Sequence, residues 1–560
     1  MAIRPTFYGF EMARAALFAS QRNIDVTGQN IANINTEGFS RQRVELSSVG
    51  MGGLNWKYPV HPAQNVGLGV NVDSVRRVRD EFLDIRYRTE ASHNERFARV
   101  AETLTSVENV LDEFVMDNLY NTMTEFMNAL QNFHINSDEV EFASLMRSAA
   151  LKLTTTLNKI SQDISDIVEM QILQMDLVTK NVNNIARQLD DVNDEIRTQY
   201  LFNPLSVSNE LLDKRDLLLD QLAAFGEVTV VHDNSGPNGT PTGGIWVFFG
   251  EVDVSVMDST DPDSMEYELG LLVKGHQRGH HTIEFDINDA REQYADARAS
   301  FVDGADASFA DAVRFSWGEG SPGEGFPVIV KTGQIFGYYE MMNGVGDVEA
   351  SGDNLDFSTK GIQYFMNIID NFAITFAEVF NDFNNEGFYG GDLFVSVDDE
   401  PLSARNIIIS GEWQADPSFI VHYIDGLPTS VTSGDPLYDA DGNEIRISDA
   451  RNDNILRMID ALRREDRSFG DFVGSFQQYV GMLNTEIAIE IDYNNKRLLM
   501  SDILLLSVDS MRESIKGVSE DEEAMNLARY QKSYNAAARY MTVLDEMLEL
   551  IVMRLGIVGR

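Results

Sequence analysis

Three histidines lie close together in the segment HQRGHH, at His276, His280 and His281. Two histidines four residues apart on one helix can bind zinc, and a glutamate directly after the first completes a metalloprotease motif. Here Gly279 interrupts the pair, the following residues TIEF predict a strand, and no glutamate occupies the required position. We therefore expect a solvated turn with no metal bound.

The other segments with catalytic or metal-binding character are weaker. DADGNE (439–444) is similar to the start of a calcium loop, but its sixth residue is Glu444, where an EF-hand requires glycine, so we expect a hairpin turn. The chain has no cysteine, which excludes disulfides, thiolate metal sites and cysteine nucleophiles. It also lacks a glycine-rich phosphate loop and a G-x-S-x-G nucleophile elbow. We therefore expect neither an enzyme nor a bound cofactor.

The charge of the chain is strongly negative and unevenly placed. Lys and Arg number 44 against 89 Asp and Glu, which gives a net charge of −45 over 560 residues. Such a surface repels phosphate backbones and anionic lipid, so we expect no nucleic acid and no membrane as partner. Residues 1–50 carry +1 and residues 521–560 carry −1, so the middle of the chain holds the excess. Nearly neutral ends can pack against copies of themselves, while the acidic middle suits a surface facing solvent.

Both ends of the chain carry apolar residues at heptad spacing, which predicts long helices with a narrow apolar stripe. The N-terminal stripe consists of Phe10, Leu17, Ile24 and Ile31. The C-terminal stripe consists of Leu527, Tyr534, Met541, Leu548 and Leu555 at one heptad position and Tyr530, Ala537, Leu544, Ile551 and Val558 at the other. One interpretation is an antiparallel pair that closes a domain within one chain. The alternative is that the helices also pair with neighbouring copies and become ordered on assembly.

The N-terminal helix ends in a segment that we name the joint, residues 30–42, with the sequence NIANINTEGFSRQ. Asparagine tolerates left-handed backbone angles, Gly38 accepts positive φ without steric cost, and Thr36 can bond to nearby backbone. A helix stop needs only one such residue. The density of polar groups therefore invites a second explanation, which depends on the segments that flank the joint.

The pattern along the chain predicts an α+β multidomain fold, in which long, coiled-coil-like helices in the terminal and middle domains surround an inserted β-rich domain and both termini lie at the same end. Residues 80–225 show helical periodicity, with Ser208 as an N-cap and Gly226 as a stop for one helix. Further helices are expected at 361–383, 452–464 and about 468–516, before an acidic linker, SEDEEA. We expect three domains. Residues 1–60 and 520–560 form a terminal helical domain. Residues 61–230 and 334–519 form a helical middle domain with a mixed segment at 391–450, and residues 231–333 form an inserted β-rich outer domain.

The joint carries the motif A-N-x-x-T-x-G-F-x-R, from Ala32 and Asn33 through Thr36, Gly38 and Phe39 to Arg41. This motif resembles the N-terminal signature of the bacterial flagellar rod, hook and hook-associated axial proteins, as does VGLGVNVDSVRRVRDEFLDIRYR at 66–88. The segments NELLDKRDLLLDQLAAFGEVTV, GEWQADPSFI and NLARYQKSYNAAARYMTVLDEMLELIV are similar to those of the family member at the junction of hook and filament.

The resemblance implies a structural component of the flagellum, which joins hook to filament as a mechanical adaptor and serves as the base for filament assembly. It implies an extracellular location after export by the flagellar type III system. Its partners would be other copies of the chain, the hook protein, a second hook-filament junction protein and an export chaperone at the C-terminal helix. The resemblance also implies that the terminal helical domain lines an inner tube. We further expect Asn33, Gly38 and Phe39 to shape the joint. We also expect Leu17, Ile24 and Ile31 to pair with Met541, Leu548 and Ile551.

Two alternatives remain open from the sequence. The chain could be another flagellar axial protein, of the hook or the distal rod, although its length and residues 208–231 count against this. It could also be an exported adhesin or metal-dependent enzyme with its activity in residues 231–333.

Overall fold

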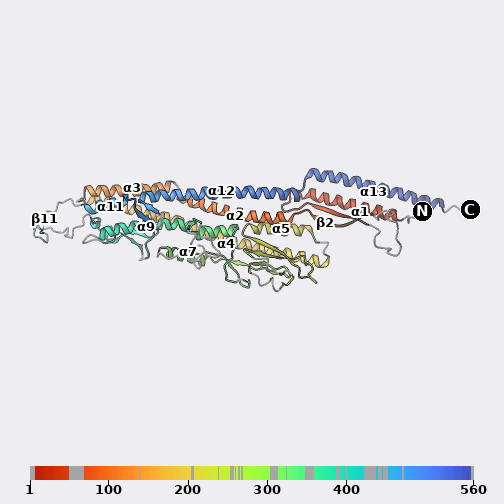
Figure 1. Cartoon of the computed structure of the whole chain (residues 1–560), viewed down its shortest axis with the longest axis horizontal. Coiled ribbons are helices and arrows are strands. Elements are labelled where there is room, and N and C mark those ends of the chain that lie inside the picture. Colours follow the sequence, from red (N-terminus) through yellow and green to blue (C-terminus); the bar gives the residue numbers. More distant parts are fainter. Residues whose placement is uncertain are drawn as a thin grey trace. The chain divides into compact units, whose positions relative to one another are not determined.

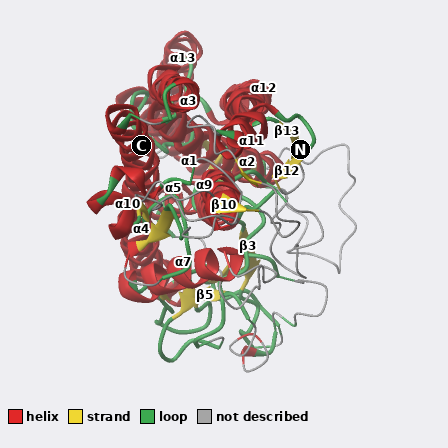
Figure 2. Cartoon of the chain, turned by 90° about the vertical axis from the view of Figure 1, so that its left-hand side faces the viewer, coloured by secondary structure: helices red, strands yellow, loops and turns green. Residues whose placement is uncertain are grey.

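The computed structural model describes most of the chain. The described residues are 7–49, 69–111, 113–137, 139–203, 207–237, 239–252, 258, 260–262, 265, 269–302, 313–322, 324–346, 359–385, 391–397, 400–421, 437–438, 444–445, 452–469 and 472–555. Helices, red in Figure 2, dominate these residues, and the strands, yellow in the same figure, are short and antiparallel. The expected α+β multidomain class is therefore confirmed. No helix in the described part of the chain is both long and apolar enough to span a bilayer.

The chain divides into two compact units. Unit 1 comprises residues 1–91, 184–281 and 503–560, and unit 2 comprises residues 92–183 and 282–502. Three helices contribute to both units, namely α2 (Glu81–Val110), α4 (Val140–Phe202) and α12 (Phe476–Lys516). This division is coarser than the three domains expected from the sequence, whose boundaries stay predictions.

Unit 1 contains the two terminal helices and a small sheet (Figure 1). The terminal helices are α1 (Phe7–Ala32) and α13 (Glu520–Leu555). Besides these and its parts of α2, α4 and α12, unit 1 contains β1 (Gln42–Ser48), β2 (Val70–Arg77), α5 (Asn209–Ala223), β3 (Val228–His232), β4 (Ile245–Phe249) and β5 (Leu271–Val273). Strands β1 and β2 form an antiparallel ribbon, and β3, β4 and β5 form a three-stranded antiparallel sheet. Every residue of β4 is buried, and Trp246 and Phe248 form a core with Met265 and Leu271.

Unit 2 is mainly helical. Its other elements are α3 (Glu113–Ile135), β6 (Ile283–Glu284), α7 (Ile287–Val302), β7 (Ser316–Trp317), α8 (Gly333–Asn343), α9 (Ile362–Asn385), β8 (Phe394–Ser396), β9 (Ile407–Ile409), α10 (Gly411–Ala415), the 3₁₀ helix η5 (Pro417–Phe419), β10 (Leu437–Tyr438), β11 (Glu444–Ile445), α11 (Asp453–Arg463), β12 (Arg467–Phe469) and β13 (Phe472–Gly474). Phe376 of α9 lies at the centre of its aromatic core, with ring centroids 5.3 Å from Phe126, 5.1 Å from Phe394 and 5.7 Å from Phe476.

The long helix α4 confirms the heptad pattern predicted in the middle of the chain. All eight residues of that pattern are buried, namely Val168, Met175, Val178, Val182, Ile185, Leu189, Val192 and Ile196. A stripe of this length is buried only when other parts of the chain cover it, and in its C-terminal half Asn193 donates hydrogen bonds to the carbonyls of Ile245 in β4 and of Lys274. Ser208 precedes α5 as expected, although its hydroxyl makes no capping hydrogen bond.

The structure corrects three details of the predicted elements. The insertion contains a helix, α7, as well as strands. Helix α12 begins at Phe476, because residues 467–469 and 472–474 pair as the antiparallel strands β12 and β13. The expected acidic linker is instead the first turn of α13. The backbone N–H of Glu522 lies 3.5 Å from the hydroxyl of Ser519, which precedes the helix. The four carboxylates of this turn are stabilised by the positive end of the helix dipole.

Candidate functional site

The joint ends α1 with a chain of local hydrogen bonds. The Asn33 side chain donates to the Gln29 carbonyl at 2.9 Å, and the Thr36 hydroxyl donates to Asn33 Oδ1 at 3.2 Å. The backbone N–H of Phe39 then donates to the Thr36 carbonyl at 3.2 Å. Gly38 has φ of 77°, as predicted, and a β-carbon there would lie 3.3 Å from Leu217 of α5. Glycine is therefore required both by backbone angle and by close packing.

A buried asparagine outside the predicted set holds the two sides of the joint together. Asn30, which is 1% exposed, donates from Nδ2 to the Gln42 carbonyl at 2.9 Å and accepts from the Gln42 N–H at 2.9 Å. Its side chain thus forms both hydrogen bonds that a neighbouring strand residue would form. The start of β1 is fixed against the last turns of α1.

Arg41 links the joint to the C-terminal helix. Its Nε donates to Glu523 at 2.9 Å, its Nη2 lies 2.8 Å from the same carboxylate, and its Nη1 lies 2.9 Å from Glu522. Glu523 is 2% exposed and also accepts from Asn30 Nδ2 at 3.3 Å. In addition, the Arg41 N–H donates to the carbonyl of Lys516, the last residue of α12, at 2.8 Å. The motif arginine therefore holds the start of α13 by a fork of charged hydrogen bonds.

Helix α5 presents three aspartates to the joint on one face. Asp213, Asp216 and Asp220 are three and four residues apart, so they share that face. Arg77 of β2 donates from Nη1 to Asp213 at 2.9 Å and to Asp216 at 2.6 Å. Arg79 lies 2.9 Å from Asp216. The backbone of the joint also participates, because the Ser40 N–H donates to Asp213 at 3.2 Å.

Two further helices join these groups. Arg79 binds both oxygens of Asp84 on α2, at 2.9 and 2.8 Å. Arg88 of α2 donates to Asp220 at 2.7 Å, and Arg512 of α12 donates to Asp84 at 2.6 Å and also to Asp220. We refer to these groups as the aspartate network, consisting of Asp84, Asp213, Asp216 and Asp220 with Arg77, Arg79, Arg88 and Arg512.

The charges of the aspartate network stabilise one another. Burial alone would raise the pKa of Asp84, but its hydrogen bonds to Arg79 and Arg512 and their charges outweigh that effect and lower it. The pKa of Asp216 is likewise lowered, because several arginines outweigh its burial. The pKa of Arg512 is raised despite burial by Asp220 and Asp84. Asp84, Asp216 and Arg512 are therefore ionised near neutral pH.

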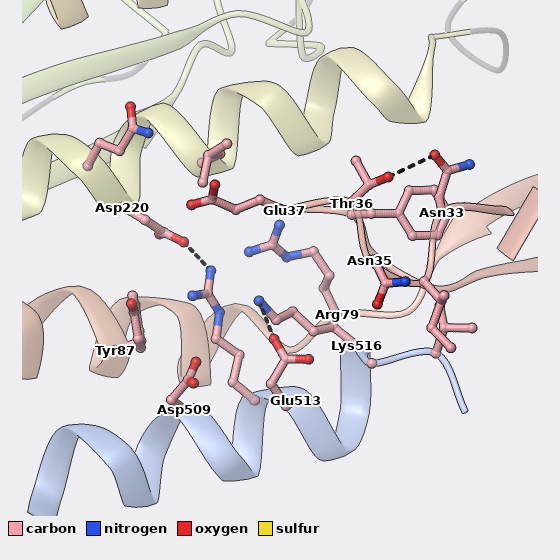
Figure 3. Close-up of a pocket in the computed structure, with 18 residues that line it drawn as sticks. Asn33, Asn35, Thr36, Glu37, Arg79, Tyr87, Asp220, Asp509, Glu513 and Lys516 are labelled. Carbon is pink, nitrogen blue, oxygen red and sulfur yellow. Dashed lines mark hydrogen bonds and ion pairs between the residues drawn. The ribbon is translucent and has the colours of Figure 1, made fainter. Parts of the chain in front are cut away.

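A cavity of about 450 Å³ lies beside the joint (Figure 3). Its walls are residues 33–39 of the joint, parts of α2, α5 and α12, and residues 517–518 between α12 and α13. Arg512 donates to Asp220, and Lys516 lies 2.7 Å from Glu513. The cavity is thus bordered by both chain segments that connect the terminal helices to the rest of unit 1.

The terminal helices α1 and α13 lie side by side as an antiparallel pair (Figure 1). A β-carbon at Gly9 would lie 3.0 Å from Leu544, and Asn30 contacts Glu523. These two contacts set the register, which places Leu17 opposite residues near 536. Within a single chain, therefore, Leu17, Ile24 and Ile31 do not pair with the residues expected from the sequence, which were Met541, Leu548 and Ile551.

Burial along α1 differs from the predicted stripe. Its fully buried residues are Ala13, Ala19, Ser20, Asn23, Val26, Thr27 and Asn30, while Phe10, Leu17, Ile24 and Ile31 are only half-buried. Small side chains let the paired helix and the ribbon approach closely, so the face carrying them is the one that is covered. On α13, the predicted residues Leu527, Met541, Leu544 and Leu548 are half-buried, and Tyr534 and Ile551 are exposed.

A second face of α13 is apolar and uncovered. We name it the outer face, and it consists of Tyr540, Val543, Met547 and Leu550, which are between 44% and 54% exposed. Among the described residues of α13, only Glu523 is buried. The pair formed with α1 thus leaves most of the apolar surface of this helix in contact with water.

The histidine segment forms the predicted turn, but its side chains are packed rather than solvated. His280 Nδ1 lies 3.1 Å from Asp190 on α4, whose other oxygen accepts from the Gly279 N–H at 2.8 Å. The His276 ring stacks on Trp246. In the described part of the chain, no three His, Cys, Asp or Glu side chains are arranged to hold a metal ion. Residues 439–443 of the predicted hairpin lie outside the described residues.

Residues of the site that the sequence interpretation missed are Asn30, Glu523 and the aspartate network. One signal was visible: the three aspartates of α5 recur at helical spacing, and the segment RRVRDEF at 76–82 is rich in arginine. Glu523 carried no comparable signal, because it lies in a run of four acidic residues of which it alone is buried.

Known proteins resemble this chain over almost its full length. The chain is 27% identical over 566 residues to Flagellar hook-associated protein 1 of Bacillus subtilis, covering 99% of each chain. It is 22% identical over 590 residues to the protein of the same name from Salmonella typhimurium and 21% identical over 567 residues to that of Escherichia coli, covering 96% of this chain and 98% of the relative in each case.

Family profiles and a solved structure agree with these relatives. Residues 104–286 match the family described as the Flagellar hook-associated protein FlgK helical domain, and residues 10–39 match the Flagella basal body rod protein family. The fold is similar, with a TM-score of 0.54 and 10% identity, to the flagellar hook junction protein FlgK from Burkholderia pseudomallei, over 77% of this chain and all of that one. The chain is therefore similar over almost its full length to flagellar hook-associated protein 1, and two of its segments match families of flagellar axial proteins.

Proposed function

We propose that this protein is a structural component of the bacterial flagellum that forms the junction between hook and filament. Its full-length similarity to proteins named hook-associated protein 1 supports this role. In this role it is a mechanical adaptor and the base on which the filament assembles. Nothing in the role requires catalysis or a cofactor.

The observation that carries the proposal is the uncovered apolar surface of α13. A helix of 36 residues is about 54 Å long, and a lone helix pair cannot bury more than one side of it. Exposed apolar residues at helical spacing mark a surface for association. Copies of the chain that pack through their outer faces would cover this surface, so the protein would function as a closed or helical homo-oligomer.

The joint suits a mechanical role. Force applied to the terminal helices passes through the joint and the connection between α12 and α13. Arg41, Asn30 and Glu523 tie these two connections to each other, and the aspartate network ties the joint and β2 to α2, α5 and α12. Charged groups that are largely buried and fully paired resist displacement because separating them leaves an uncompensated charge.

The remaining partners follow from the same role. We propose the hook protein on one side, a second hook-filament junction protein on the other, and an export chaperone that covers the exposed C-terminal helix before assembly. Export through the flagellar type III system would place the protein outside the cell. A chain without cysteine cannot form disulfides that would obstruct its passage in an unfolded state.

The experiment is electron microscopy of cells in which the gene is deleted, with the spent medium assayed for filament protein. Bare hooks, with filament subunits lost to the medium, are expected, and expression of the intact gene should restore filaments. Filaments of normal length on the deletion strain would refute the junction role.

A further inference from the structure

The cavity beside the joint contains positive and negative side chains, but they do not balance. Its three cations are Arg79, Arg512 and Lys516, and each is held by a carboxylate of the same chain. Two of its carboxylates, Glu37 of the joint and Asp509 of α12, form no hydrogen bond or ion pair within the described residues. They belong to different walls of the cavity, so an added cation could lie between those walls.

Two aromatic side chains lie in the cavity together with these carboxylates. Tyr87 and Phe39 line the same cavity. Burial raises the pKa of Tyr87, and the charges of Asp220, Asp509 and Glu37 raise it further. Several carboxylates therefore act on one point of the cavity. Carboxylates combined with aromatic faces are the surroundings that a guanidinium or ammonium group prefers.

We propose that this cavity is a socket for a basic side chain of α13 from a second copy of the chain. The inference rests on the proposed assembly of the protein and names a contact within it. A guanidinium or ammonium group seated there would be attracted by the charges of Glu37 and Asp509, which both line the cavity. It would also tie the joint to α12 across both connections that lead to the terminal helices.

The described part of α13 supplies the matching charge. Arg529, Lys532 and Arg539 are exposed, and none of them has an ion-pair partner among the described residues. Arg529 and Lys532 precede the outer face at helical spacing, so a copy that packs against the outer face would also meet these cations. The positive charges of these residues match the unpaired carboxylates of the cavity, so we infer that one of these three side chains occupies it.

The occupant must come from another copy because α13 leads away from the socket. Val518 lines the cavity, and Arg529 follows it by about 11 residues, or roughly 16 Å along a helix. Lys532 and Arg539 are farther still. A lysine or arginine side chain is too short to return over that distance.

Disulfide trapping tests the contact without background, because the natural chain has no cysteine. Asp509→Cys is combined in turn with Arg529→Cys, Lys532→Cys and Arg539→Cys, and each variant replaces the natural gene in living cells. Isolated flagella are oxidised and examined for covalent dimers. The matched control replaces Ser507, an exposed residue on the opposite side of α12 that does not line the cavity, with cysteine in the same combinations.

At least one pair containing Asp509→Cys should give dimers, while the pairs containing Ser507→Cys should not. Flagella that form normally without dimers from any of the three pairs, or with equal dimers from the control, would overturn the socket. Such a result would leave the junction role intact, because that role is judged by whether filaments form at all.

A second measurement does not depend on cysteine. Glu37→Gln with Asp509→Asn should reduce the amount of the protein retained on isolated hooks by roughly tenfold at low expression, since two charge contacts are lost. Glu139→Gln with Glu378→Gln removes the same charge from two exposed residues and should have no effect. Equal retention of both double variants would contradict the proposal.

Discussion

The outer face of α13 provides the most direct test of assembly. Val543 is 44% exposed and Met547 is 54% exposed in the single chain. Val543→Asp with Met547→Asp should leave the fold of the monomer unchanged, because substitutions at exposed positions usually alter stability by only about 0.5 kcal/mol. The same double variant should fail to assemble.

The magnitude follows from the exposed fractions. Burying a complete Val or Met side chain contributes about 1.5–3 kcal/mol, so covering the exposed half of each contributes about 1 kcal/mol. Losing both contributions, about 2 kcal/mol, weakens association roughly 30-fold. The two new carboxylates would add the cost of burying charge without a partner, so 30-fold is a lower estimate.

The assay has two parts. Circular dichroism and thermal unfolding of the purified monomer report on its fold, and immunoblots of isolated hooks report on assembly in a strain lacking the natural gene. Gln531→Asp with Thr542→Asp introduces the same charge on exposed polar positions of α13 and should assemble normally. Normal assembly of the outer-face variant would refute the reasoning. Loss of helix in its monomer would instead show that this face closes a domain within one chain.

Other predictions concern the joint. Glu523→Gln should lower the free energy of unfolding by about 2 kcal/mol in urea titrations, because it removes the charge of a buried partner of Arg41, whereas Glu522→Gln, at an exposed partner, should cost less than about 1 kcal/mol. Gly38→Ala should cost about 1–2 kcal/mol in the same titrations, since alanine disfavours positive φ, and an unchanged midpoint would contradict the observed backbone angle. The lowered pKa values in the aspartate network mean that its stabilisation is complete above about pH 4 and is lost as the pH falls through the folded pKa values. Thermal unfolding followed from pH 7 to pH 3 should show this loss, and Asp216→Asn should reduce the pH dependence.

Elements whose pattern is local were predictable from the sequence. The eight heptad residues of α4 are buried as expected, because a long apolar stripe has to be covered wherever its partner lies. Gly38 takes positive φ as predicted, because that preference belongs to a single residue. The boundary between α12 and the preceding hairpin was missed, although Gly470 and Asp471 between two phenylalanines are a turn signal in the sequence.

The candidate site depended on residues that are distant in sequence. The motif at the joint was visible, but its partners were not: Arg41 and Glu523 are 482 positions apart, and Asp84 and Arg512 are 428 apart. In a chain with 89 acidic residues, no local signal distinguishes the carboxylate that will be buried.

The sequence by itself determined the helical class, the stripes at both ends, the glycine of the joint and the absence of cysteine chemistry. These properties follow from residue types and from spacing within one element. Only the tertiary structure decided which face of α1 is covered, which acidic residues are buried beside arginines, and that α13 keeps its outer face exposed. The physical reason is that burial and ion pairing depend on which segments meet in space, and periodicity along one helix does not specify its neighbour.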